Sequence, residues 1–313
     1  MHTIGSKQLL LLLIVGSAAT HCSGSDDSPD PMTNPDSGIV ADSGVDCTDA
    51  FIASVGGSVQ DQDGTVLETM VDGAGAPISG PGNQLCIEQA DGPPLCLRPV
   101  QTAAGAFSIQ IPSTDRCLTG AAMRVFPFDD QFTTTYCQID FGSSPASDFT
   151  ISMPLTMYEV EAPTTLPPEG DGTTARTVVF NGGIEVDVTP DRFFPGVGGY
   201  AGLQSRLIQS SDPVPCGAAS QNFDGIVAFA PEGNIQDAGG GGQGFPVRIP
   251  AGDLAEGAMV DLFVQGGLDC NLEDGSLVKE AEWVQFGTGV VDANGMISGG
   301  RLPCFNWLAW RAQ

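Results

Sequence analysis

The chain has 313 residues, with 38 acidic against 11 basic residues and a formal net charge of −27. So strong a negative charge repels phosphate backbones and argues against nucleic-acid binding. Glycine (42 residues) and proline (23 residues) together exceed a fifth of the chain, which favours short strands and turns over long helices.

Residues 1–21 have the three zones of an export signal. Lys7 supplies a positive start, Leu9 to Val15 form an apolar run, and Gly16 to His21 are mostly small. The run is far shorter than the ~20 residues that span a bilayer, so we expect a cleaved signal peptide and no transmembrane helix.

The end of this segment, Ala19-Thr20-His21-Cys22, resembles a lipobox, with Ala19 and His21 where lipoproteins carry Leu and a small residue. The resemblance implies cleavage before Cys22, which is then diacylated and anchors the protein to a membrane. The alternative is cleavage after Ala19, which yields a soluble secreted protein. Parity favours the lipid, because nine cysteines become eight once Cys22 is acylated, and eight can all pair.

Residues 22–46 are rich in Asp, Ser, Gly and Pro and have almost no large apolar side chains, which predicts an unstructured, lipid-anchored tether. We therefore expect an exported protein of the cell envelope, held at the outer membrane. Loss of the signal also removes both histidines, His2 and His21, and leaves Lys279 as the only lysine.

The rest of the chain is predicted to be all-β, in two consecutive β-sandwich domains. Residues 47–162 form the first, residues 163–172 a Pro- and Thr-rich linker, and residues 173–313 the second, with one larger domain as the alternative. Apolar residues alternate with polar ones, as in half-buried strands. The alternating sets are Phe107, Ile109 and Ile111; Phe149, Ile151, Met153, Leu155 and Met157; Ile184, Val186 and Val188; Phe245, Val247 and Ile249; and Val260, Leu262 and Val264. Asp63-Gly64, Asp91-Gly92 and Asn294-Gly295 are expected to form turns between strands.

The first predicted domain has three recognisable features. Residues 56–64 read GGSVQDQDG, the Pro77-Ile78 step follows them, and residues 104–112 read AGAFSIQIP. Together they resemble a carboxypeptidase regulatory-like domain over roughly residues 55–160. The resemblance implies a small transthyretin-like sandwich that acts as a spacer or interaction module without catalysis. The Cys86 to Cys96 segment departs from the family and is expected to be a hairpin clipped by a disulfide.

The second predicted domain resembles ZU5-like β-sandwiches in two short places. These are Phe245 to Gly252, which carries a V-x-I-P-A-G step, and the aromatic ending Phe305 to Trp310. The resemblance covers about a quarter of the domain and implies another β-sandwich.

Eight cysteines are disulfide candidates, and none has the CxxC spacing of redox or metal motifs. We predict the pairs Cys86–Cys96 and Cys117–Cys137, with one further bond crossing between the domains. The candidates are Cys47, Cys86, Cys96, Cys117, Cys137, Cys216, Cys270 and Cys304.

Catalytic and metal chemistry find little support. A mature chain without histidine lacks the usual base for a serine or cysteine nucleophile, and Lys279 lies among acidic residues as a solvated surface group. Zinc normally takes His or reduced Cys, and the acidic turns around Asp61 lack calcium-loop spacing, so no metal and no cofactor are expected. A hydrolase based on paired carboxylates is the remaining enzymatic alternative.

The aromatic residues Phe305, Trp307 and Trp310 are candidates for a carbohydrate- or peptide-binding platform, although core packing is the favoured role. Alternation places Phe305 and Trp307 on one strand face and Trp310 on the other, so all are core only if the strand is central. The function that the sequence favours is a non-catalytic envelope lipoprotein, a structural or adhesion-type module whose partners are the membrane and envelope proteins or polysaccharide.

Overall fold

The computed structural model describes most of the chain beyond the tether. The described residues are 52–68, 70–71, 77–88, 94–99, 101–103, 105–118, 120–127, 131–142, 147–195, 199–235, 243–267 and 270–313. The predicted signal peptide, the tether, Cys22, Cys47 and the Asp91-Gly92 turn lie outside them. The described part is built from strands and three single-turn 3-10 helices, so the predicted all-β class is confirmed. Among the described residues, no helix is long and apolar enough to span a membrane.

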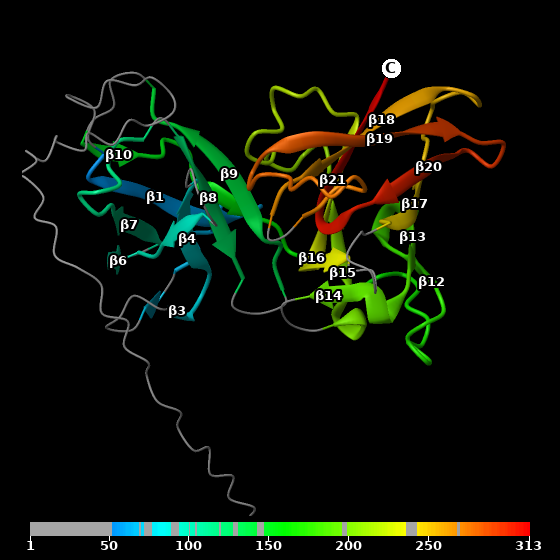
Figure 1. Ribbon diagram of the computed structural model, residues 1–313, viewed down its shortest axis with the longest axis horizontal. Coiled ribbons are helices and arrows are strands. Elements are labelled where there is room, and N and C mark those ends of the chain that lie inside the picture. Colours follow the sequence, from blue (N-terminus) through cyan, green and yellow to red (C-terminus); the bar gives the residue numbers. More distant parts are fainter. Residues whose placement is uncertain are drawn as a thin grey trace, which may run out of the picture. The chain divides into compact units, whose positions relative to one another are not determined.

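The first half of the described chain, residues 52–158, forms two facing sheets (Figure 1). One has the strand order β10-β1-β7-β6, with β11 also paired to β1, and the other has the order β5-β4-β8-β9. The first sheet contains β1 (Ser54–Asp61), β6 (Gln101–Ala103), β7 (Ala106–Gln110), β10 (Asp148–Thr150) and β11 (Leu155–Met157). The second contains β4 (Gly82–Ile87), β5 (Leu95–Leu97), β8 (Gly120–Phe126) and β9 (Thr135–Asp140), and β2 (Met70–Val71) pairs separately with β3 (Pro77–Ser79).

The core of the first half fills the space between these two sheets. Phe107 and Ile109 of β7 are buried, as the alternation predicts, and they belong to one apolar cluster with Leu85 of β4 and Met123 of β8. Each such side chain contributes roughly 1.5–3 kcal/mol on burial, so the two sheets depend on each other for stability.

The run from Phe149 to Met157 differs from its prediction as a single strand. It forms two short strands, β10 and β11, which pair in parallel with successive parts of β1. Pro154 lies between them, and proline cannot donate a ladder hydrogen bond. Met153 in the break is 75% exposed, whereas Leu155 and Met157 are buried.

The second half, residues 164–313, is built on one ten-stranded sheet with the order β12-β13-β17-β20-β19-β18-β21-β16-β14, and β15 also pairs with β16. All its strand pairs are antiparallel. The first strands are β12 (Arg176–Val179), β13 (Glu185–Val188), β14 (Phe193–Pro195), β15 (Gln204–Leu207) and β16 (Gly225–Ile235). The last are β17 (Phe245–Pro250), β18 (Met259–Gln265), β19 (Trp283–Val291), β20 (Met296–Leu302) and β21 (Cys304–Ala312), and the 3-10 turns are Asn181–Gly183, Pro190–Arg192 and Tyr200–Gly202.

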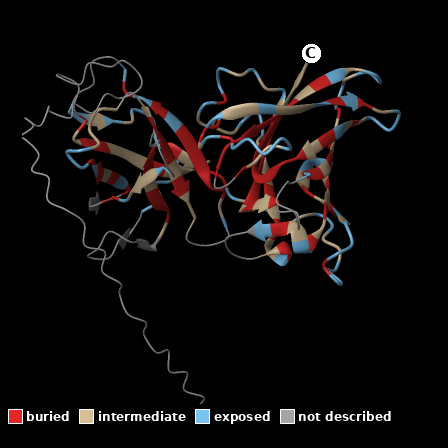
Figure 2. Ribbon diagram, in the orientation of Figure 1, coloured by how far each residue is buried: buried red, intermediate tan, exposed pale blue. Residues whose placement is uncertain are grey.

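This large sheet curls around its own core. Strands from both ends of the sheet order supply side chains to one cluster, in which Phe305 of β21 is fully buried. Its ring lies 4.8 Å from that of Phe193, 5.1 Å from that of Phe229 and 6.0 Å from that of Phe245, measured between centroids. Figure 2 shows buried residues along the strands of both halves.

A third apolar cluster joins the two halves. It contains Tyr136 of β9 from the first half, Ala228 of β16 and Trp307 of β21 from the second, and Tyr158 from the end of the first half. The described residues, which begin at residue 52, accordingly belong to one compact unit. The predicted linker also packs, since Tyr200 donates a hydrogen bond to the carbonyl of Pro167 at 2.9 Å. The proposed boundary between two domains at residues 163–172 stays a prediction.

Candidate functional site

The seven described cysteines are all disulfide-bonded. The structure joins Cys86 to Cys96, the hairpin pair that the sequence predicts. The two cysteines lie directly opposite each other on the paired strands β4 and β5. The predicted Cys117–Cys137 bond is wrong, because Cys137 is bonded to Cys216 of the second half. The remaining described bond is Cys270–Cys304 within the second half, and the partner of Cys117 is none of the other described cysteines.

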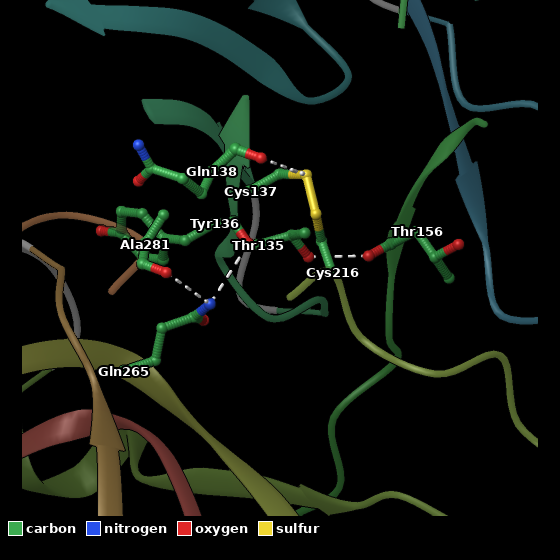
Figure 3. Close-up of a disulfide and its surroundings, with 8 residues drawn as sticks. All are labelled: Thr135, Tyr136, Cys137, Gln138, Thr156, Cys216, Gln265 and Ala281. Carbon is green, nitrogen blue, oxygen red and sulfur yellow. Dashed lines mark hydrogen bonds between the residues drawn. A yellow bond between two sulfur atoms is a disulfide. The ribbon is translucent and has the colours of Figure 1, made fainter. Parts of the chain in front are cut away.

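The Cys137–Cys216 bond is one of several links between the two halves, and Figure 3 shows its surroundings. Cys137 lies in β9 beside Tyr136, and the Cα atoms of the two cysteines are 5.1 Å apart. The side-chain amide of Gln265, from β18 of the second half, donates to the carbonyls of Tyr136 and Ala281 at 3.4 Å each. The bond therefore lies next to polar contacts between β9 and the large sheet.

A buried group of charged and polar side chains lies beside these links and is here called the joint cluster: Arg124, Tyr136 and Glu232. Tyr136 donates its hydroxyl proton to Glu232 Oε1 at 2.5 Å, and Arg124 donates to Glu232 Oε2 at 3.4 Å. The side chains of Arg124 and Glu232 are only 14% and 10% exposed. A buried carboxylate is costly unless it is paired and hydrogen-bonded, and here both oxygens have such partners.

Local sequence explains how these groups come together. Arg124 interrupts the apolar strand β8, and Glu232 follows the apolar run of β16. Gly267 leaves room for them, since a Cβ on it would lie 2.2 Å from Glu232 Oε1 and 2.9 Å from the Tyr136 hydroxyl. Only glycine lets the backbone approach the carboxylate this closely.

Burial, and then the adjacent Glu232 carboxylate, raise the pKa of Tyr136 well above its usual value. Tyr136 therefore stays a neutral hydroxyl that donates to Glu232. Because Tyr136 and Arg124 already occupy the carboxylate oxygens, Glu232 is poorly placed to accept a proton from an external substrate. The joint cluster thus holds strands of the two halves together and does not resemble a general acid–base pair.

The groups beside the joint cluster do not form a metal centre. Among the described residues, one group has the spacing of metal ligands, namely Cys86, Cys96 and Glu280, and both of its sulfurs are in the disulfide. Lys279 is 62% exposed and bonds to the equally exposed Glu88 at 2.7 Å, which raises the pKa of the lysine. Lys279 is thus the surface residue that the sequence predicts, and an amine held in its charged form is a poor base.

The structure corrects the predicted faces of the C-terminal aromatics. Phe305 and Trp307 are buried in different clusters, and Trp310 packs with Phe305 against the core of the second half. The facing strand β16 shifts register between Ala228 and Gly233, which interrupts the simple alternation assumed for β21. β21 is central in its sheet, the condition under which both faces are core. Phe305 and Trp307 are therefore unavailable to a ligand, and of the three aromatics only Trp310 is partly exposed.

Sequence reasoning did not identify the joint cluster. Its signal was present: a cation inside one apolar strand and an anion inside another. Comparison of the chain with protein-family models and with curated proteins finds no match. What the fold and the site define is therefore the class alone, an all-β chain with two cores joined by a disulfide and a buried charged cluster.

Proposed function

We propose that this protein is a non-catalytic cell-envelope lipoprotein whose folded part acts as a structural or adhesion-type interaction module. The observation that carries the proposal is the joint cluster. The buried side chains of Arg124 and Glu232 are bonded to each other across the two halves, with the tyrosine hydroxyl 2.5 Å from the carboxylate. Catalytic carboxylates, in contrast, must present an unoccupied oxygen to a substrate.

The links between the halves favour a rigid body. The indole of Trp307 donates to the carbonyl of Thr134 at 2.8 Å, and this bond is buried, as is the contact from Gln265 to Tyr136. Buried hydrogen bonds and a covalent cross-link resist separation of the halves better than exposed ion pairs do. Such a body, presented on a tether, suits a spacer or an adhesion module.

The two facing sheets of residues 52–158 support the resemblance to a carboxypeptidase regulatory-like domain, whose members are accessory modules. The proposal for this half is therefore a spacer-type sandwich. The sheet with the order β5-β4-β8-β9 packs on the large sheet of the second half through Tyr136 and Ala122.

Catalysis is tested with the purified lipid-free chain, residues 23–313, on peptidase, esterase and glycosidase substrates. We expect no turnover, and the same result for Glu232→Gln. Reproducible turnover that is abolished by changing a single Asp or Glu overturns the non-catalytic proposal. Turnover that is equal in every acidic variant identifies a contaminating enzyme, and repurification must then remove it.

The anchor is tested by growing cells with a palmitate analogue. We expect label on the wild type and on a Cys47→Ala variant, but not on Cys22→Ala, which should leave the membrane fraction. A mature N-terminus at Thr20, or label that persists in Cys22→Ala, contradicts the lipoprotein proposal.

A further inference from the structure

A pocket with a volume of about 360 Å³ opens on the second half, and no residue of the joint cluster lines it. This lies within the range of roughly 300–1,000 Å³ typical of small-molecule sites. Trp310 and two carboxylates, Asp224 and Asp253, line it together with the turn from Pro250 to Leu254. None of the lining residues carries a positive charge.

Trp310 is held in place by a glycine on the neighbouring strand. Gly225 is its direct partner across β16 and β21, and a Cβ on Gly225 would lie 2.0–2.6 Å from three atoms of the six-membered ring of the indole. The ring therefore lies against bare backbone, and the partly buried side chain borders the pocket. This arrangement gives a flat aromatic wall in a fixed position.

Hydrogen bonds hold Asp224 and the turn from Pro250 to Leu254 in place, and Asp253 is accessible to a ligand. The Asp224 carboxylate accepts the backbone N–H of Ala312 at 2.6 Å, and Asp224 itself donates its backbone N–H to the carbonyl of Trp310 at 2.8 Å. The turn opposite is held by a bond from the Ala251 N–H to the Gly295 carbonyl at 2.9 Å. Asp253 is exposed on this turn.

We infer that this pocket binds a non-anionic pyranose ring, as part of a saccharide. The apolar face of a pyranose packs on a flat aromatic ring, and its hydroxyls donate hydrogen bonds to carboxylate oxygens. The two carboxylates repel anionic sugars. A quaternary ammonium group, the other ligand that carboxylates and indole attract, is bound best inside a cage of several aromatic rings, and one ring borders this pocket.

The pocket deepens the proposed function by giving the module a ligand class, and it rests on that function in one respect: the saccharide is bound and released intact. Both aspartates are exposed, and the Asp224 carboxylate already accepts the backbone N–H of Ala312. The pocket thus offers hydrogen-bond acceptors to a sugar.

The experiment titrates mature protein with neutral and amino oligosaccharides, with glucuronic acid as the anionic counterpart and tetramethylammonium as the cation. The indole N–H signal of Trp310, assigned by its loss in Trp310→Phe, reports binding by NMR. We expect a saturable shift at about millimolar sugar and none with glucuronic acid. Because Trp310→Ala lacks the reporting indole, its binding is followed through the backbone amide signals of Ala251 and Gly252, which line the pocket, and the wild type is measured in the same way. Trp310→Ala should weaken binding at least about tenfold and Asp253→Asn by about threefold. Glu256→Gln changes an exposed acid in the next turn along the chain, which does not line the pocket, and this variant should bind like wild type.

Absence of any saturable shift overturns the inference, as does sugar binding that survives Trp310→Ala. A shift with tetramethylammonium and none with sugars replaces the pyranose by an organic cation and also overturns it. The sugars are analysed after the titration: intact sugar supports both proposals. Cleaved sugar with binding that depends on Trp310 keeps the site and refutes the non-catalytic function.

Discussion

Replacing Tyr136 by phenylalanine removes one oxygen atom from the joint cluster and leaves the ring in place. The hydroxyl is buried and donates to the Glu232 carboxylate at 2.5 Å, so the bond lost is a charge-assisted one. Bonds of this kind contribute about 1.5–3 kcal/mol, about twice the value of a neutral bond. At about 2 °C per kcal/mol for a chain of this size, the melting temperature should fall by roughly 3–6 °C.

Tyr200→Phe is the matched control. Tyr200 is also buried, at 5% exposure, and its hydroxyl also donates a hydrogen bond. The acceptor is the neutral carbonyl of Pro167. That variant should lose about 0.5–1.5 kcal/mol. Urea unfolding followed by tryptophan fluorescence measures both. If Tyr136→Phe costs no more than Tyr200→Phe, the argument that the carboxylate strengthens this bond fails.

The same cluster predicts how stability changes at high pH. Burial raises the pKa of every tyrosine in the chain: Tyr136, Tyr158 and Tyr200. Unfolded tyrosines titrate near pH 10, so the stabilisation is complete below about pH 10. Above that pH the unfolded chain loses protons that the folded chain retains, and the free energy of unfolding falls. We expect the fall to be shallower in Tyr136→Phe, and equal slopes in urea titrations of variant and wild type would contradict this.

Two further perturbations test the links within the fold. Replacing Cys137 and Cys216 by alanine opens a closed loop of 79 residues and should cost about 4.5 kcal/mol on the chain-entropy model. Replacing Cys86 and Cys96, whose sequence separation is 10, should cost about 2.7 kcal/mol. Equal losses in chemical denaturation would show that loop length does not decide the effect. The hydrogen bond from Arg248 lowers the pKa of Asp187. The contribution of this carboxylate to the free energy of unfolding is therefore present above about pH 4 and is lost as the pH falls below that value. Asp187→Asn should therefore cost about 1 kcal/mol at neutral pH and flatten the acid limb of the stability profile, and a parallel acid limb would refute that.

Local pattern was enough to predict the strands whose two faces meet different surroundings. Phe107 and Ile109, or Val247 and Ile249, alternate with polar residues because one face of their strand meets the core. Alternation has a period of two that sequence displays directly. The Cys86 to Cys96 pair was equally local, since the two cysteines are only 10 residues apart in sequence and lie opposite each other on β4 and β5.

The pattern failed where a proline or a bulge intervened. The run around Met153 alternates without interruption in sequence, yet Pro154 divides it into two strands. Likewise, the register shift opposite β21 placed Trp307 on a different side from Phe305. Spacing alone does not reveal such a shift, because it depends on which strand pairs alongside.

Tertiary structure alone decided the contacts between the halves. Cys137 pairs with a cysteine 79 residues away, and Glu232 meets Tyr136 across 96 positions of sequence. The sequence marks Glu232 as a charge within an apolar strand, but its partner depends on how the outer faces of two sheets pack. The pocket at Trp310 likewise required a glycine on β16 and a turn after β17 to meet one aromatic residue. Residue types and their periodicity determine which surfaces are apolar, whereas the packing of those surfaces determines which polar groups meet.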